Sequence, residues 1–267
     1  MKKQNLDQYK DLKDQKFKLF DYTGTNGEFD YQFYKKAQDV LNKKKLHQYG
    51  PSEPLVKQLA HYAKREWKEI QYTPRVGLCH GTRRGDEQKW FSKHLEIPVY
   101  GTDIAESANQ FKNTFQWDFH DIKPEWVNKI DFIYSNSLDH SYDPIFCLRQ
   151  WFRCLKPGGI CILGWSKDDR GSDSKIVKAP EDLLSHDCFQ GSEQFYEQII
   201  KIAGSTDGTT GLKYTLNTEY MGSLHGDSIM WNMEDSVWGL QDKHFLIQKF
   251  SNSRQEEHPT AVVETNE

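Results

Sequence analysis

Apolar residues recur along the first third of the chain with the spacing of amphipathic helices. Between Phe29 and Lys45 they return at steps of three and four residues, and they do so again between Leu55 and Ile70. Residues at these steps share one face of a helix, so the pattern predicts two helices. The segment 51–54, Pro-Ser-Glu-Pro, separates them, because proline interrupts a helical pattern.

From residue 75 onward the rhythm changes to short apolar runs that alternate with helical stretches. The runs predict strands over 75–80, 98–104, 129–135 and 160–165. Helical spacing predicts helices over 86–95, 144–155 and 192–202. Strands that alternate with helices indicate βαβ units and a largely parallel sheet with right-handed crossovers, which is an α/β fold.

The later part of the chain is less regular. Residues 213–219 and 244–249 alternate well enough to predict two late strands, which we expect to be antiparallel. The stretch 167–240 is expected to form a substrate lid or acceptor wall inserted in the domain. It offers His225, Asp227, Trp231 and Trp238. Aromatic faces beside polar groups suit a sugar-like acceptor, and the alternative is that these tryptophans are core residues.

The length and composition indicate one folded core with polar ends. The chain has 267 residues, of which 36% are hydrophobic and 13% aromatic, enough for a single domain. We expect an N-terminal helical extension over 1–50, the main domain over 51–250 and a disordered tail over 251–267. The oligomeric state stays open.

Charge and cysteine usage restrict the classes of partner and compartment. The formal net charge of −4 gives no global basic field, so we expect no nucleic-acid partner. No stretch approaches the roughly 20 apolar residues of a membrane span, and the first residues lack the apolar run of a signal peptide. The five cysteines show no paired C-x-x-C spacing, which favours a reducing, cytoplasmic location.

A glycine turn leaves the first predicted strand of the alternating region and opens a helix. It runs Gly81-Thr82-Arg83-Arg84-Gly85 and is followed by Asp86 and Glu87. The dinucleotide pattern G-x-G-x-x-G is absent, and carboxylates at a helix start make a poor seat for a pyrophosphate. The turn better suits the amino-acid end of S-adenosylmethionine, whose carboxylate Arg83 can pair with. The alternative is a tight turn without a ligand.

Two acidic positions extend this pattern. Asp103, followed by Ile104, ends the next predicted strand 18 residues after Gly85, where a carboxylate can accept hydrogen bonds from both ribose hydroxyls. The alternative for Asp103 is a helix N-cap. In the later segment Asp118-Phe119-His120, a carboxylate beside aromatic residues can take an adenine amino group while an apolar side chain covers the ring. An ordinary Asp-rich turn is the alternative there.

A cluster of polar residues follows the strand predicted over 129–135. The segment 135–143, Ser-Asn-Ser-Leu-Asp-His-Ser-Tyr-Asp, carries several such side chains in one short loop. Ligands of open parallel sheets bind at the carboxyl ends of the strands, so this loop is a candidate site. Capping of the next helix is the alternative for any single residue.

Taken in order, these segments resemble the class I S-adenosylmethionine-dependent methyltransferases, over about residues 72–166. The segments that carry the resemblance are Val76–Gly85 for the first motif, Val99–Asp103 for the second, Asp118–His120 for the adenine loop, Asp131–Ser137 for the fourth-strand motif and Leu155–Gly159 for the turn before the fifth strand. The run Ser135–His140 is similar to a bacterial subgroup linked to saccharide or surface-polymer pathways.

The resemblance implies a Rossmann-like, mostly parallel seven-stranded sheet with helices on both faces and an antiparallel last strand. It implies S-adenosyl-L-methionine as cofactor, held by Gly81, Thr82, Arg83, Gly85, Asp103, Ile104, Asp118, Phe119, His120, Asn136 and Ser137. Arg83 stands where the family's usual pattern has its middle glycine, which is a departure.

The resemblance also implies an enzyme that methylates a small molecule, and a saccharide hydroxyl is the favoured acceptor. His140 is the first candidate for a general base, and Asp139 is the second, as base or as orienting partner. A divalent metal held by Asp139, His140 and Asp143 is a minor alternative, and the favoured prediction has no metal. A catalytically silent S-adenosylmethionine-binding protein with a regulatory or assembly role is the competing function, and a nicotinamide oxidoreductase is disfavoured.

Overall fold

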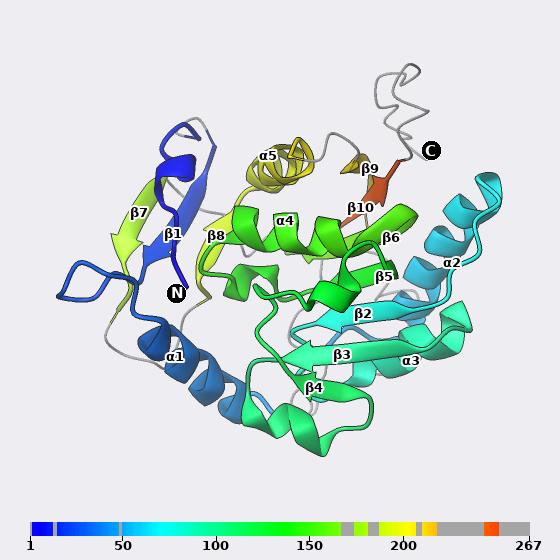
Figure 1. Cartoon of the computed structure of the whole chain (residues 1–267), viewed down its shortest axis with the longest axis horizontal. Helices are drawn as coiled ribbons and strands as arrows, with labels where there is room; N and C mark the ends of the chain where they lie inside the picture. Colours follow the sequence, from blue (N-terminus) through cyan, green and yellow to red (C-terminus); the bar gives the residue numbers. More distant parts are fainter. Residues whose placement is uncertain are drawn as a thin grey trace, which may run out of the picture.

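The structure, a computed structural model, describes residues 2–12, 15–47, 50–166, 174–180, 187–206, 210–217 and 243–250. Its main element is a seven-stranded sheet with the order β4-β3-β2-β5-β6-β10-β9 (Figure 1). The strands are β2 (Gly77–His80), β3 (Val99–Asp103), β4 (Thr114–Gln116), β5 (Ile130–Ser135), β6 (Leu155–Trp165), β9 (Thr210–Asn217) and β10 (Lys243–Lys249).

The strand directions confirm the predicted fold class. Strands β4, β3, β2, β5 and β6 pair in parallel, whereas β10 is antiparallel to both β6 and β9. This is a Rossmann-like, mostly parallel seven-stranded sheet whose last strand in sequence is antiparallel. The carboxyl ends of β2, β3 and β5 lie at one edge, where ligands of such sheets bind.

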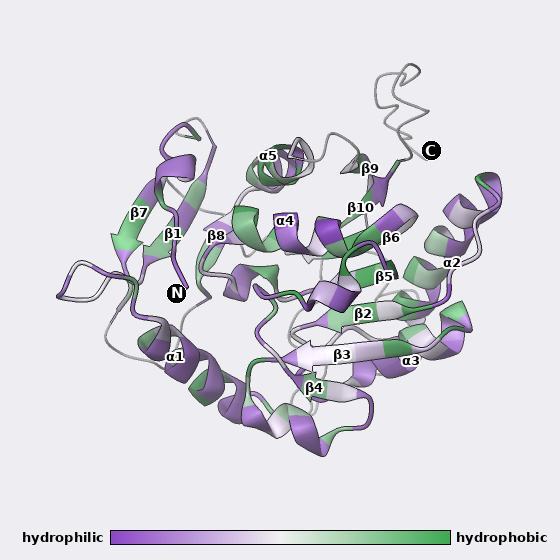
Figure 2. Ribbon diagram, viewed as in Figure 1, coloured by the Kyte–Doolittle hydropathy of each residue, from purple (hydrophilic) through white to green (hydrophobic). Residues whose placement is uncertain are grey.

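Helices cover both faces of the sheet. Helices α2 (Glu53–Glu69) and α3 (Asp86–Leu95) pack on one face, and α4 (Pro144–Cys154) and α5 (Glu193–Gly204) pack on the other. Successive side chains of β5 point to opposite faces of the sheet. Phe132 packs in the core beneath α2 and α3, and Ile133 packs in the core beneath α4 and α5. Figure 2 shows the resulting pattern, with β5 and β6 largely hydrophobic between the helices.

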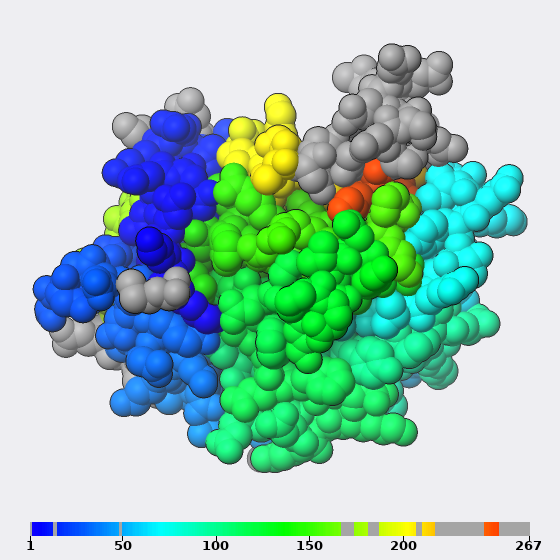
Figure 3. Space-filling view, viewed as in Figure 1, coloured from blue at the N-terminus to red at the C-terminus, as the bar shows by residue number. Residues whose placement is uncertain are grey.

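The N-terminal extension contains a strand as well as the predicted helix. Strand β1 (Phe17–Asp21) lies between β7 (Lys175–Lys178) and β8 (Phe189–Gly191), parallel to the first and antiparallel to the second. We predicted no strand here, because a run of five residues is too short for a clear alternation. The strands that pair with β1 lie more than 150 residues later in the chain. In the space-filling view the N-terminal residues, in blue, lie directly against the central part of the chain, in green (Figure 3).

Helix α1 (Tyr31–Lys44) follows β1 and lies across the carboxyl edge of the main sheet, facing the ends of β2 and β3 (Figure 1). It begins at Tyr31 because the Asp30 side chain accepts a hydrogen bond from the Phe33 N–H, which is an N-cap. Short 3₁₀ turns complete the described elements: η1 (Asp7–Tyr9), η2 (Glu106–Gln110), η3 (Pro124–Trp126) and η4 (Leu138–His140).

Some predictions concern residues outside those that the structure describes. These are the acceptor-wall candidates His225, Asp227, Trp231 and Trp238 and the tail 251–267. Within the described ranges, no helix is both long enough and apolar enough to cross a membrane.

Candidate active site

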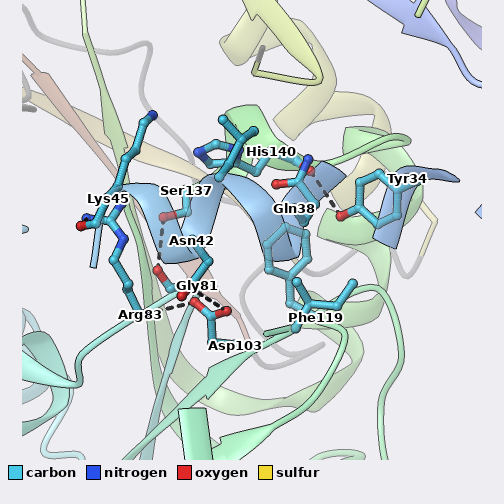
Figure 4. Close-up of a pocket in the computed structure, with 12 residues that line it drawn as sticks. Tyr34, Gln38, Asn42, Lys45, Gly81, Arg83, Asp103, Phe119, Ser137 and His140 are labelled. Carbon is cyan, nitrogen blue, oxygen red and sulfur yellow. Dashed lines mark hydrogen bonds between the residues drawn. The ribbon is translucent and has the colours of Figure 1, made fainter. Parts of the chain in front are cut away.

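A cavity opens at the carboxyl edge of the sheet, between the strand ends and helix α1 (Figure 4). On the sheet side it is lined by residues that the sequence assigns to cofactor or catalysis: Gly81, Arg83, Asp103, Ile104, Phe119, Ser137 and His140. On the other side it is lined by residues of α1 and the residue that follows it: Tyr34, Gln38, Leu41, Asn42 and Lys45. The fold therefore brings most of the predicted site residues to one place.

The glycine turn after β2 adopts backbone angles that favour glycine. Gly81 and Gly85 have φ values of +73° and +83°, and Gly85 is the N-cap of α3. A Cβ atom on Gly81 would lie 2.6 Å from the Cβ of Ser137, so the turn touches the loop after β5. Arg83 has φ of +46°, which lies in the left-handed region that favours glycine.

The side chains of this turn and of the loop after β5 differ in their hydrogen bonding. The Arg83 guanidinium donates to the Lys45 carbonyl at 3.2 Å and reaches α1 in this way. Thr82 is buried, and its Oγ1 has no hydrogen-bond partner in the described part of the chain. Ser137 Oγ donates to the Gly81 carbonyl at 3.1 Å and lies 3.1 Å from Asn136 Oδ1, which links the two loops.

Asp103 lies at the end of β3 and is buried. Its carboxylate accepts hydrogen bonds from the Arg83 N–H at 2.8 Å, the Ala105 N–H at 3.0 Å and the Asn42 side-chain amide at 2.9 Å. Burial raises the pKa of Asp103, and the hydrogen bonds from Ala105 and Arg83 counteract only part of this shift. Asp103 does not cap the turn that follows, because η2 begins after Ala105 with no side-chain cap. The ribose role of Asp103 stays a prediction.

The segment after β4 divides its side chains between the cavity and the core. Phe119 lines the cavity, whereas Asp118 and His120 are buried and bind each other, Oδ1 to Nδ1, at 2.7 Å. Asp118 also accepts from Tyr31 Oη at 2.9 Å and from the Lys2 ammonium. Burial would raise the pKa of Asp118, but His120 and Lys2 together hold it well below its usual range. This carboxylate therefore already has several partners inside the protein.

His120 continues this chain of contacts into the core. Its Nε2 atom lies 2.7 Å from Ser141 Oγ, and its ring stacks on Tyr142 with 3.7 Å between the ring centres. His120 is not among the residues that line the cavity. Its predicted contact with the cofactor is untested.

Asp139 and His140 lie in η4, directly after the loop that follows β5. Asp139 Oδ1 and His140 Nδ1 are buried, and neither has a hydrogen-bond partner within the described ranges. Burial lowers the pKa of His140 to about 4, although the carboxylate of Asp187 opposes the shift. Burial and the same Asp187 carboxylate raise the pKa of Asp139 well above its usual range. At neutral pH His140 is therefore an uncharged imidazole, the form that can accept a proton.

The structure corrects the alternative metal set. Asp143 is the N-cap of α4 and accepts from Tyr9 Oη at 2.7 Å, so its carboxylate is engaged away from Asp139 and His140. Asp187 takes its place, since Asp139, His140 and Asp187 each offer one ligand atom within 4.8 Å of the others. The sequence alone could not bring residue 187 to this site.

Helix α1 supplies lining residues that we did not predict. Gln38 and Asn42 are buried polar residues four positions apart, on the same face as Tyr34. Polar residues on the buried face of an amphipathic helix could have indicated a site, because buried polar side chains need hydrogen-bond partners. For Asn42 one partner is Asp103 on the opposite wall of the cavity, whereas the Gln38 amide contacts Cys188 Sγ, outside the cavity lining.

Comparison with known proteins agrees with this geometry. Residues 78–163 match the family model described as a methyltransferase domain. No curated protein sequence matches the chain significantly.

Among solved structures, the plantazolicin methyltransferase BpumL in complex with a triazolic desmethylPZN analog and SAH aligns with a TM-score of 0.52 at 14% identity, covering 82% of this chain and 96% of that one. BpumL with SAH alone aligns with a TM-score of 0.50 at 14% identity, covering 82% and 90%. The 1,6-didemethyltoxoflavin-N1-methyltransferase of Burkholderia thailandensis aligns with a TM-score of 0.44 at 14% identity, covering 73% and 79%.

Proposed function

We propose that this chain methylates a hydroxyl group of a small, saccharide-like acceptor, with S-adenosylmethionine as the methyl donor. The match of residues 78–163 to the methyltransferase-domain model supports the predicted class of enzyme, and the Rossmann-like fold agrees with it. One observation carries the proposal. The imidazole of His140 lines the same cavity as Gly81 and Asp103, so the candidate base and the candidate cofactor residues share one space (Figure 4).

The residues at the strand ends fit the cofactor's chemical groups. The backbone of the turn at Gly81 allows close approach, and Arg83 offers a cation for the methionine carboxylate. Asp103 offers carboxylate oxygens for the ribose hydroxyls, and Phe119 offers an apolar face for the adenine ring. When bound, the cofactor supplies an electrophilic methyl group on a sulfonium, so the protein's own task is to position the acceptor and exclude water.

His140 is the side chain best placed to take a proton from the acceptor. It is uncharged at neutral pH, and its buried Nδ1 has no partner in the described part of the chain. Asp139 has a raised pKa and tends to hold its own proton, so it suits an orienting role better than that of the base. General-base assistance of this kind contributes roughly 10²–10⁴-fold to a rate.

We propose that the stretch 167–240 supplies a lid or wall for the acceptor. The described parts of that stretch include β7 and β8, which join the N-terminal strand β1 in the small sheet. We further propose that the enzyme acts in the cytoplasm in a saccharide or surface-polymer pathway. Its five cysteines are free and buried, which suits a reducing compartment.

Cofactor binding is tested first, without an acceptor. Thermal unfolding is measured with S-adenosylmethionine, S-adenosylhomocysteine and NAD, for the wild type and for Asp103→Asn. We expect the two adenosyl ligands to raise the melting temperature of the wild type, and the variant to lose most of that rise. If NAD alone raised the melting temperature, the proposed S-adenosylmethionine site would be wrong.

Turnover is tested next, with labelled S-adenosylmethionine and a panel of monosaccharides and their glycosides. We expect methylated product from the wild type and a loss of at least 10²-fold in kcat for His140→Gln. Cofactor binding with no transfer to any acceptor would favour the silent binding protein. Full activity of His140→Gln would remove His140 as the base.

A further inference from the structure

Asp187 lies beside His140 although the two are 47 positions apart in the sequence. Its Oδ1 atom is 3.9 Å from His140 Nε2, while the other ring nitrogen, Nδ1, is buried without a partner among the described residues. An imidazole with one nitrogen toward a carboxylate and the other unused is arranged as a general base with its orienting group. We propose that Asp187 is a positioning residue for His140, an inference that rests on the function proposed above.

Cys188, the residue after Asp187, holds this part of the backbone beside the loop that carries His140. The Cys188 N–H donates to the Asp139 carbonyl at 2.7 Å, and the Cys188 carbonyl accepts from the Phe20 N–H of β1 at 3.0 Å. The Cys188 side chain is fully buried, and its Sγ lies 3.2 Å from the Gln38 side-chain amide of α1. These contacts attach residue 187 at once to the loop that carries His140, to the small sheet and to the wall of the cavity.

The 3.9 Å separation suits a contact that shortens when the ring becomes charged. Hydrogen bonds of catalytic groups are often long before substrate binds, so this distance is compatible with an orienting role. The His140 side chain, which lines the cavity, is 19% exposed and that of Asp187 is 30% exposed, so neither is freely solvated. A carboxylate here favours the ring orientation in which Nε2–H points toward it.

The charged groups around His140 shift its pKa in opposite directions. Burial is the strongest influence and disfavours the imidazolium, as do the cations Lys45 and Arg83. The carboxylates of Asp187 and Asp103 favour it, and Asp139 is the adjacent residue in η4. Asp187 is the stronger of the two favourable carboxylates, so its removal should lower the pKa of His140 further.

In the proposed step the acceptor oxygen forms a bond to the methyl carbon while the carbon–sulfur bond breaks. The electron pair of that bond stays on sulfur, and the hydroxyl proton moves to His140 Nδ1. The ring is then an imidazolium whose Nε2–H faces Asp187, which stabilises the charge until the proton passes to solvent. No further reactant is needed.

The test compares Asp187→Asn and Asp187→Glu with the wild type. We expect Asp187→Asn to lower kcat about 10-fold with little change in KM, because the base loses orientation and charge stabilisation. The acid limb of its pH–rate profile should move to lower pH, and NMR titration of the His140 ring should show the same direction without any acceptor present. Asp187→Glu should restore part of kcat.

Asp21→Asn is the matched control. Asp21 also carries a carboxylate in the small sheet, where it pairs with Lys178 at 2.8 Å, but it is not among the residues that line the cavity. Its loss should leave kcat and the His140 titration unchanged, since its side-chain contacts, the Lys178 ion pair and a hydrogen bond from the Thr23 N–H, lie outside the cavity lining.

Three results would overturn the role of Asp187 while leaving methyl transfer intact: an unchanged kcat in Asp187→Asn, an unchanged His140 titration, or an equal loss in Asp21→Asn. A chelator that abolishes wild-type activity, with Mn²⁺ restoring it, would also overturn the role and make the Asp139–His140–Asp187 cluster a metal site. Absence of any turnover by the wild type would instead reject the proposed function itself.

Discussion

The side-chain amide of Asn42 donates a 2.9 Å hydrogen bond to Asp103 Oδ1, the carboxylate oxygen that a ribose hydroxyl would need. Ser107 Oγ holds the other end of the amide by donating to Asn42 Oδ1 at 2.9 Å. Helix α1 thus touches the predicted ribose site, and the cavity beneath it encloses about 50 Å³. Small-molecule sites are commonly about 300 Å³ or more, so we expect the lining residues of α1 to move when the cofactor enters.

Asn42→Ala should therefore strengthen cofactor binding. The ribose would no longer displace a protein hydrogen bond at Asp103, and such a bond contributes about 0.5–1.5 kcal/mol, equivalent to roughly 2- to 10-fold in affinity. Calorimetric titration with S-adenosylhomocysteine measures the change. Asn109→Ala, in η2 and away from the cavity lining, serves as the control. Weaker binding by Asn42→Ala would mean that Asn42 itself contacts the cofactor.

Gly81→Ala should destabilise the fold more than Gly27→Ala does. Both glycines have similar positive φ values, +73° and +79°, so both substitutions carry a backbone cost of about 1 kcal/mol. Only at Gly81 would the new Cβ meet another residue, 2.6 Å from Ser137 Cβ, whereas nothing lies within 4 Å at Gly27. Urea unfolding should show a further loss of about 1–3 kcal/mol for Gly81→Ala. Equal losses would mean that the loop after β5 moves aside freely.

Stability should fall as the pH drops below about 6.5. Burial lowers the pKa of both His80 and His244 to about 3, so the folded chain resists protonation that the unfolded chain accepts. Their contribution is complete above the unfolded pKa and declines as the pH falls toward 3, by about 1 kcal/mol per pH unit for each histidine.

Urea unfolding between pH 7.5 and 5.0 measures this slope. His244→Phe should make it shallower, because one of the two buried rings no longer titrates. His61→Phe replaces an exposed histidine of α2 and should leave the slope as it is. An unchanged slope in His244→Phe would show that this ring is solvated in the folded state.

The pH–rate profile should report His140 directly. Because burial lowers the pKa of His140 to about 4, the ring is unprotonated and ready as a base above that value. We expect kcat/KM to rise as the pH increases through about 4 and then to stay level toward pH 8. An acid limb near the ordinary histidine value of about 6.5 would mean that the ring is exposed to water during the reaction.

The local features of this site could be predicted from the sequence because they are set by nearby residues. The glycine turn after β2 and the carboxylate of Asp103 at the end of β3 follow from short motifs that the sheet topology carries to a common edge. The predicted helix over 86–95 agrees with α3, since its first residue follows a glycine that ends the turn. Patterns of this kind need no knowledge of distant contacts.

The contacts across the cavity could not be predicted, because they join segments far apart in the chain. Asp187 reaches His140 through the pairing of β8 with β1, and α1 reaches Asp103 by lying across the sheet edge. Asp143 shows that closeness in sequence can also mislead. Its closeness to His140 in sequence suggested a shared metal, yet its carboxylate caps α4, because a residue before a helix is well placed to accept a free N–H.

The small sheet has a consequence for the order in which the protein assembles. Strand β1 pairs Lys18 with Lys175, so a segment made early in synthesis lacks its partners until 157 further residues have been added. Contacts of such long range close late, because the loop entropy is lost before the pairing compensates for it. We expect the five parallel strands β2–β6 to form first and the surroundings of His140 to be completed later, so newly made chains would bind cofactor before they can methylate.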